Sequence, residues 1–186
     1  MLFQKDQNRQ KIISAAGELF YHFGVHKTNM EDVAKKAGVT KRTVYQHFQN
    51  KEVLVEMVMA ETSKHFSDQL NQKLNAKISS TELIIDFLKR AFEKCDEDHG
   101  LPTEEIKKMQ YETAIRYFYP YLQKVIERGV KSKEFKSKNP QMHAELIWQL
   151  IGTVFHLTEC PEKNTVKNLN QYKKFLLSEV PRILKS

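Results

Sequence analysis

The sequence predicts an all-α protein, and three observations lead to that prediction. Apolar residues recur at three- and four-residue spacing along most of the chain, which is the period of amphipathic helices. Only six Gly and five Pro interrupt the 186 residues. No run alternates β-branched and polar residues as a strand would. We therefore expect about nine helices, arranged as an N-terminal three-helix head and a C-terminal helical bundle.

Capping residues and turn formers mark the ends of the expected helices. Thr28 and Glu31 form a capping box that begins the second helix. Gly38 supplies the positive φ of a tight turn, and Thr40 caps the third helix. A break expected near Pro120 divides one long segment and brings the number of helices to about nine. The helical segments are expected over residues ~7–23, ~28–37, 41–47, ~50–74, ~79–95, ~106–130, ~140–158 and ~164–184.

Composition and charge restrict the class of protein. A chain that is 40% hydrophobic and 28% charged is typical of a globular domain. No apolar run reaches the ~18 residues of a membrane-spanning helix, and the first residues lack the apolar core of a signal peptide. A cytoplasmic protein without membrane association is expected. The net charge is +7, and residues 1–51 carry nine Lys/Arg against four Asp/Glu, which favours a polyanionic partner.

Patterns of catalytic and metal-binding residues are missing from the sequence. The seven His residues form no HExxH motif, and neither a Gly-rich phosphate loop nor a GxSxG elbow is present. His22 and His26 stand four residues apart without an evident third ligand. Cys95 and Cys160 are expected to be reduced thiols. We therefore expect no enzymatic activity, no cofactor and no metal.

Residues 28–48 have the pattern of a helix-turn-helix. Ala34 and Ala37 are small enough for two short helices to cross closely, with Gly38 between them. Val44 and Phe48 would anchor the second helix. The side chains left to project outward are hydrogen-bond donors that suit the major groove of DNA. They are Lys41, Arg42, Thr43, Gln46 and His47. On this spacing alone, a solvated helix-turn-helix that binds no nucleic acid is the alternative.

A longer motif surrounds this segment and extends from Ile12 to Val58 without a gap. Its positions are Ala15-Ala16, Leu19-Phe20, Gly24, Thr28, Val33-Ala34, Ala37-Gly38-Val39-Thr40-Lys41, Thr43-Val44-Tyr45, His47-Phe48 and Lys51-Glu52. This motif resembles the N-terminal signature of the TetR family of transcriptional regulators. The main departure is Arg42, because the family frequently has Gly there. The family's DNA contacts therefore do not transfer to that position.

The resemblance implies a helix-turn-helix DNA-binding domain over residues 1–51 and a ligand-binding and dimerisation domain over residues 52–186. It implies phosphate contacts at Thr28, Thr40, Tyr45, His47 and Lys51. Candidates for base contacts are Lys41, Arg42, Thr43 and Gln46. The expected function is a repressor that leaves a near-palindromic double-stranded DNA operator when a small apolar or aromatic effector binds. An activator, and a nucleoid-organising or interaction protein with the same head, are the alternatives.

The body of the chain resembles the family in layout, and two of its features are expected from that layout. The last two helices would pair with their symmetry mates in a homodimer. The predicted interface consists of Ala144, Ile147, Trp148, Ile151, Gly152, Phe155, Leu169, Tyr172, Leu176 and Val180, with an intramolecular core as the alternative. The predicted effector pocket consists of Phe66, Phe87, Phe92, Met109, Tyr111, Tyr117, Phe118, Tyr121, Trp148 and Phe155, although aromatics at helical spacing also suit a plain core.

Overall fold

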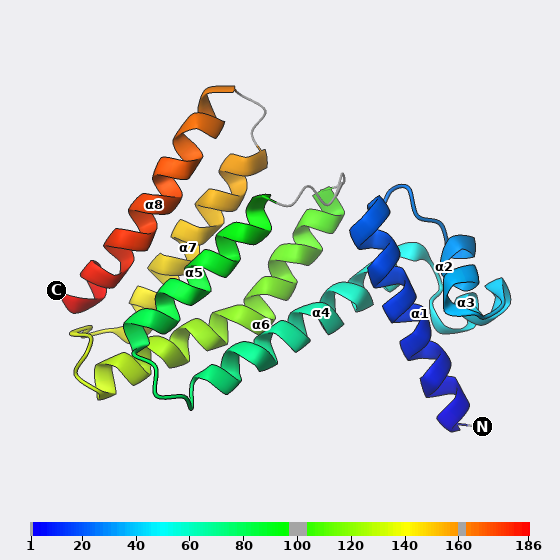
Figure 1. Cartoon of the computed structure of the whole chain (residues 1–186), viewed down its shortest axis with the longest axis horizontal. Coiled ribbons are helices and arrows are strands. Elements are labelled where there is room, and N and C mark those ends of the chain that lie inside the picture. Colours follow the sequence, from blue (N-terminus) through cyan, green and yellow to red (C-terminus); the bar gives the residue numbers. More distant parts are fainter. Residues whose placement is uncertain (1, 97–103, 160–162) are drawn as a thin grey trace. The chain divides into compact units, whose positions relative to one another are not determined.

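The structure is a computed structural model that describes residues 2–96, 104–159 and 163–186, with side chains described for residues 6–93, 108–154 and 169–186. The described residues form eight α-helices and no strand (Figure 1). The helices are α1 (Leu2–Phe23), α2 (Met30–Ala37), α3 (Lys41–His47), α4 (Lys51–Lys73), α5 (Ser80–Asp96), α6 (Glu104–Lys131), α7 (Pro140–Glu159) and α8 (Lys163–Lys185). The all-α prediction is confirmed.

The expected break near Pro120 is wrong, because α6 continues through this residue. A proline inside a helix removes one backbone hydrogen bond and costs about 3 kcal/mol. Burial of the residues that follow offsets that cost: Tyr121 and Leu122 are 1% and 0% exposed, and Val125 and Ile126 are fully buried. The packing of the second half of α6 therefore keeps the helix continuous, and the described helices number eight rather than nine.

The chain divides into two compact units. The first takes the residues up to His65 and the part of α6 that ends at Ala114. The second takes Phe66 to the end of α5, the rest of α6 from Ile115, and α7 and α8. The predicted functional boundary after residue 51 stays a prediction. None of the described helices combines the length and the apolar character that crossing a bilayer requires.

The core of the first unit joins α1, α2, α3 and the beginning of α4. Its fully buried members come from all four helices: Ile12, Ala16, Val33, Val44, Phe48, Leu54 and Val55. At Gly17 of α1, an added Cβ would lie 3.5 Å from a methyl group of Val58 on α4, so these two helices approach closely. The head is therefore held together by residues as far along the chain as Val58.

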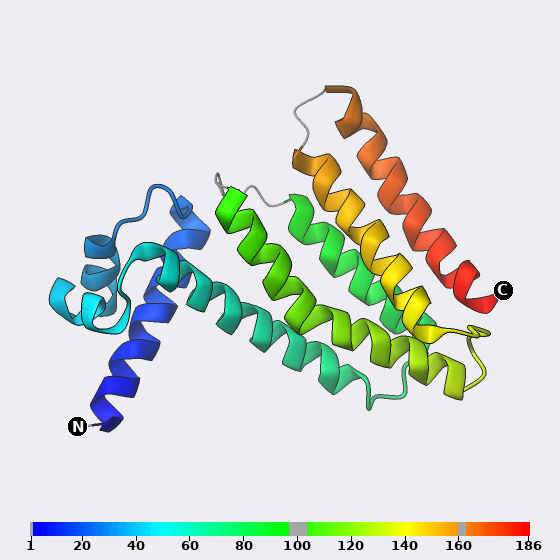
Figure 2. The ribbon, with the colours of Figure 1, turned by 180° about the vertical axis from the view of Figure 1, so that it is seen from behind.

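The core of the second unit lies where α5, α7 and α8 pack against one another. These three helices run side by side in Figure 1, and Figure 2 shows them from behind with α7 in front. Their buried faces supply Leu83, Ile84, Phe87, Leu88, Ala144, Ile147, Ile151, Leu176, Val180 and Leu184. Together with the second half of α6, this packing explains why the C-terminal sequence repeats apolar residues at helical spacing.

A carboxylate from a distant part of the chain caps the first turn of α5. The Glu134 carboxylate accepts hydrogen bonds from the backbone N–H groups of Ser80 and Thr81, each at 2.7 Å. Burial alone would raise the pKa of Glu134. The hydrogen bonds from Thr81 and from the backbone of Ser80 outweigh burial and hold this pKa below its usual value. The ionised form of Glu134 therefore stabilises the folded state.

Glu134→Gln should lower the free energy of unfolding by about 1 kcal/mol at pH 7, the usual effect of a lost helix cap. Because the pKa of Glu134 is lower in the folded state, its contribution is complete above the unfolded value of about 4.3 and is lost as pH falls through the folded pKa. Urea unfolding at pH 7 and near pH 3 measures this difference. Glu127→Gln, at an exposed position of α6, is the matched control. If Glu134→Gln lowered the free energy of unfolding by the same amount at both pH values, the role of ionised Glu134 as the cap of α5 would be contradicted.

Candidate DNA-binding surface

The turn between α2 and α3 has the geometry that a helix-turn-helix requires. Gly38 adopts left-handed backbone angles (φ 67°, ψ 34°), which are unfavourable for residues with a Cβ. The N–H of Val39 then donates to the carbonyl of Ala34 at 3.0 Å and closes the end of α2. Thr40 caps α3, since its hydroxyl accepts from the N–H of Thr43 at 3.1 Å. The turn at Gly38 and the cap at Thr40 are therefore confirmed.

The start of α2 differs from the prediction by one residue. The capping residue is Asn29, whose side-chain oxygen accepts from the N–H groups of Glu31 and Asp32, both at 2.9 Å. The Asp32 carboxylate accepts in return from the N–H of Asn29 at 3.2 Å. The predicted capping box of Thr28 and Glu31 is therefore wrong. Asn29 and Asp32 have the same three-residue spacing, and Asn is among the preferred N-caps, so the sequence contained this signal.

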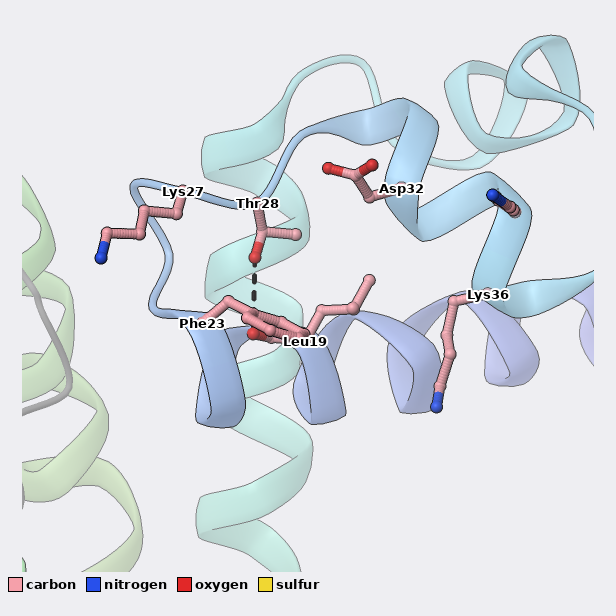
Figure 3. Close-up of a pocket in the computed structure, with 7 residues that line it drawn as sticks. Leu19, Phe23, Lys27, Thr28, Asp32 and Lys36 are labelled. Carbon is pink, nitrogen blue, oxygen red and sulfur yellow. Dashed lines mark hydrogen bonds between the residues drawn. The ribbon is translucent and has the colours of Figure 1, made fainter.

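Thr28 is used to fix the loop instead. Its hydroxyl donates to the carbonyl of Gly24, just after α1, at 3.0 Å, and to the carbonyl of Leu19, in the last turns of α1, at 3.4 Å; Figure 3 shows the contact with Leu19. The residue is only 3% exposed. The hydroxyl is therefore buried and bonded to the protein, which is unfavourable for the phosphate contact that the resemblance implied, and that contact stays a prediction.

The faces of α3 are divided between core and solvent. Val44 and Phe48 are 0% and 1% exposed and pack into the head. The remaining predicted DNA-contact positions of α3 lie on its other faces: Lys41, Arg42, Tyr45 and Gln46 are exposed, and Thr43 and His47 are partly exposed. Tyr45 is 46% exposed, which leaves its ring available at the surface. The helix therefore presents polar side chains outward from an anchored backbone.

Four of the predicted DNA-contacting side chains already have a partner within the head. The Lys41 ammonium pairs with Glu31 of α2 at 3.2 Å. The hydroxyl groups of Thr40 and Thr43 are 2.8 Å apart and bonded to each other. Lys51, the first residue of α4, donates to the carbonyl of His26 at 3.3 Å. All of these contacts are exposed, so they are weak in water and a phosphate can compete for them.

A shallow hollow lies beside α2, and sequence reasoning missed it. It has a volume of about 680 Å³ and is lined by Leu19, Phe23, Lys27, Thr28, Asp32, Lys35 and Lys36 (Figure 3). Lys36 pairs with Glu18 at 2.8 Å, and this contact holds the pKa of Glu18 below its usual value. The cluster of three lysines adds positive potential to the head. The basic excess of residues 1–51 was the only sign of it in the sequence.

The described residues of the predicted effector pocket are divided between the two units of the chain. Phe66 and Phe118 meet edge to face at 5.5 Å, and Phe87 lies 5.6 Å from Tyr121, all within the second unit. Phe92 and Trp148 are also buried in that unit, and Tyr117 is partly buried there. Met109 and Tyr111 belong to the first unit, and Tyr111 is 49% exposed. The side chain of Phe155 lies outside the described residues.

Most side chains of the predicted dimer interface are buried within one protomer, which favours the intramolecular core that was the alternative. Seven of them are 0–7% exposed: Ala144, Ile147, Trp148, Ile151, Leu169, Leu176 and Val180. In this unit α5, α7 and α8 pack against one another, and the Trp148 ring meets Tyr119 of α6 edge to face at 5.9 Å, so these side chains contribute to the core of the protomer. Of the remaining predicted residues, Tyr172 is 39% exposed, and an added Cβ at Gly152 would meet no atom within 4 Å.

A different set of apolar side chains is exposed on α7 and α8. Met142 and Leu146 are 67% and 46% exposed and lie opposite the buried face of α7. Phe175 is 59% exposed and shares a flank of α8 with Tyr172 and Ile183. We call these five residues the outer apolar stripe. The sequence-based prediction included only Tyr172 from this stripe.

Comparison with known proteins agrees with the helix-turn-helix geometry. A sequence profile described as "Bacterial regulatory proteins, tetR family" matches residues 12–58. The HTH-type transcriptional regulator YhgD of Bacillus subtilis (strain 168) is 28% identical over 162 residues, which cover 79% of this chain and 82% of that protein. The fatty acid metabolism regulator protein of the same organism is 25% identical over 142 residues, covering 72% and 73% of the two chains.

A solved structure extends the likeness over both units. The transcriptional regulator FadR from Bacillus subtilis, in complex with stearoyl-CoA, matches with a TM-score of 0.62 and 21% identity over 91% of this chain and 97% of that chain. That likeness shows the fold. With the profile match over the head and the two regulators that align along most of the chain, it leads to one assignment: the chain belongs to the TetR family of bacterial DNA-binding transcriptional regulators.

Proposed function

We propose that the protein is a repressor that binds a near-palindromic operator as a homodimer and leaves it when a small apolar or aromatic molecule binds the second unit. The observation that carries the DNA-binding part is the division of α3, with Val44 and Phe48 in the core and Arg42, Tyr45 and Gln46 at the surface. A helix anchored in this way can enter the major groove without losing its packing.

Dimerisation sets the form of the operator. A two-fold axis relates the two heads, so the half-sites should repeat about 34–36 Å apart, one turn of B-DNA. The outer apolar stripe supports a dimer through α7 and α8, because five large apolar side chains exposed on two neighbouring helices are candidates for burial in an interface. The predicted contribution of Tyr172 to this interface remains part of the proposal.

Mapping of the sites bound in the genome, followed by a reporter assay, tests the function. One or two near-palindromic sites in promoters, with transcription that rises when the gene is deleted, would support a repressor. Transcription that falls on deletion would identify an activator. Many dispersed sites without an effect on nearby transcription would favour the nucleoid-organising alternative, and no bound site at all would refute DNA binding.

Lys51→Ala should weaken binding to all DNA sequences by a similar factor. Its ammonium stands at the positive end of α4 and donates an exposed hydrogen bond to the carbonyl of His26. Loss of one phosphate contact per protomer should lower the slope of log affinity against log salt by about 2 per dimer. Fluorescence anisotropy with specific and scrambled duplexes at several salt concentrations measures both effects. An unchanged salt slope would contradict a phosphate contact.

Two buried aromatic residues support a ligand site in the second unit. Tyr121 and Trp148 are 1% and 7% exposed. Among the residues that the structure describes, the Tyr121 hydroxyl and the Trp148 ring N–H have no hydrogen-bond partner. A buried unpaired donor costs about 1–3 kcal/mol, which an acceptor on a ligand would recover. Burial and Asp86 raise the pKa of Tyr121 against the opposing effect of Arg128 and Arg90, so the hydroxyl remains a donor.

We infer that the effector carries an acceptor oxygen on an apolar or aromatic body. Phe87, whose ring lies 5.6 Å from that of Tyr121, and the Phe66–Phe118 pair of the same unit supply apolar surface. Arg90 lies 5.7 Å above the Phe66 ring and also pairs with Asp86 at 3.1 Å, as does Lys73 at 2.7 Å. Two cations around one carboxylate favour a neutral or anionic ligand over a cationic one. The stearoyl-CoA bound by FadR is an apolar chain with acceptor oxygens, in agreement with this class.

Tyr121→Phe should leave the stability of the free protein unchanged or raise it by about 1 kcal/mol, because it removes an unpaired buried hydroxyl. The same variant should need a higher effector concentration for release from DNA. Thermal unfolding and operator release with stearoyl-CoA, free fatty acids and planar phenols measure the two effects. Tyr119→Phe, on the same helix, is the matched control. A clear loss of stability in Tyr121→Phe would show that the hydroxyl is bonded in the free protein.

A further inference from the structure

We infer that Arg42 and Gln46 form the base-reading pair of α3, and that Arg42 recognises a guanine in each operator half-site. This inference rests on the proposed operator binding and assigns its sequence specificity. Four residues of α3 were candidates for base contacts: Lys41, Arg42, Thr43 and Gln46. Their surroundings in the head separate them into two groups.

Lys41 and Thr43 are held within the head. The Lys41 ammonium is 3.2 Å from Glu31, which directs it toward α2 and away from the tip of the helix. The Thr43 hydroxyl is 2.8 Å from the Thr40 hydroxyl at the cap of α3. A base contact from either residue would have to replace an existing contact. These exposed contacts are weak, but both residues must give them up to read a base, which makes Lys41 and Thr43 second to residues that have no such contact.

Arg42 and Gln46 have the opposite character. Both are exposed, and neither has a hydrogen bond or ion pair in the part of the chain that the structure describes. They lie four residues apart, on the face of α3 opposite Val44 and Phe48. One turn separates them by about 6 Å along the helix, so they reach bases one or two steps apart. This pair is the outermost part of the anchored helix.

The chemistry of the two side chains specifies the bases. The guanidinium fork of Arg42 matches the O6 and N7 acceptors of guanine in the major groove, and the Gln46 amide matches N6 and N7 of adenine. Arg42 is the second residue of α3, and residues near the N-terminus of a recognition helix are those that meet base edges.

Selection of binding sites from a random duplex library tests the assignment with wild type, Arg42→Ala, Arg42→Lys and Gln46→Ala. The wild type should select a guanine in each half-site with an adenine one or two positions away. Arg42→Ala should lose the guanine preference and bind the selected site about 10-fold or more weakly, while its affinity for a site with that guanine replaced stays at the wild-type level. Gln46→Ala should lose only the adenine preference.

Arg42→Lys separates a base contact from a phosphate contact, because it keeps the charge and removes the fork. Loss of the guanine preference in this variant supports the assignment. Arg42→Ala that weakens all sites by one factor, lowers the salt slope and keeps the guanine preference would place Arg42 on a phosphate and overturn the inference. A wild-type protein that selects no site would refute the proposed function instead. Thermal unfolding of each variant confirms that α3 remains folded.

Discussion

Phe175→Glu is expected to convert the proposed dimer to a monomer and to weaken operator binding by at least about 100-fold. Phe175 is 59% exposed in the protomer and lies on one flank of α8 with Tyr172 and Ile183, and such a group of exposed apolar side chains is typical of an interface. Burial of one Phe contributes about 1.5–3 kcal/mol, and two-fold symmetry places two copies in the interface. Each tenfold change in affinity corresponds to 1.4 kcal/mol, so the lost burial and the added charges together exceed a 100-fold effect.

Analytical ultracentrifugation and fluorescence anisotropy with an operator duplex measure the two results. Phe175→Leu keeps an apolar side chain at the position and should remain dimeric. Asn170→Glu adds the same charge to an exposed position on another face of α8 and should behave as wild type. Dimers of Phe175→Glu with normal operator affinity would show that the outer apolar stripe is not the interface.

The sequence located the apolar stripes of α7 and α8, and in the structure most of the residues predicted for a dimer interface are buried in the protomer's own core. Periodicity shows that a helix has an apolar face, and it does not show which element covers that face. Ile147 and Leu176 repeat most regularly and are covered by the protomer's own core. The apolar pattern of the outer apolar stripe is harder to recognise in the sequence. On α7, Met142 and Leu146 are followed by the exposed polar residues Gln149 and Thr153. Only the packing of α5 against both helices separates the two faces.

The head was predicted more completely because its signals are local. The Gly38 turn, the Thr40 cap and the inward positions Val44 and Phe48 each depend on residues a few positions apart. The error at Thr28 arose where two capping boxes overlap by one residue, and burial of the hydroxyl decided between them. Contacts between distant segments left no such signal. The Glu134 carboxylate that caps α5 is an example, since its partners are 53 and 54 residues away.

Gly129 illustrates another long-range constraint that only the folded chain reveals. The ring of Phe135 packs against Gly129 on the side where a Cβ would stand, and Phe135 is 2% exposed. A Cβ at residue 129 would lie 2.8 Å from Cγ of Phe135 and closer still to Cδ2 and Cε2. The ring has little freedom to move away, because the Gly129 carbonyl accepts hydrogen bonds from the N–H groups of Glu134 and Phe135 at 2.9 and 3.0 Å.

Gly129→Ala should therefore lower the free energy of unfolding by about 3 kcal/mol, although Ala is favoured over Gly in a helix by about 1 kcal/mol. For a chain of this length, the melting temperature should fall by about 6–12 °C in differential scanning calorimetry. Gly17→Ala is the matched control, since its Cβ would meet Val58 at an ordinary 3.5 Å, and it should be neutral or stabilising. Phe135→Leu should lower the free energy of unfolding by less in the Gly129→Ala background than in wild type, because the smaller side chain relieves the overlap. Equal costs in both backgrounds would show that Phe135 is not the residue that excludes a side chain at position 129.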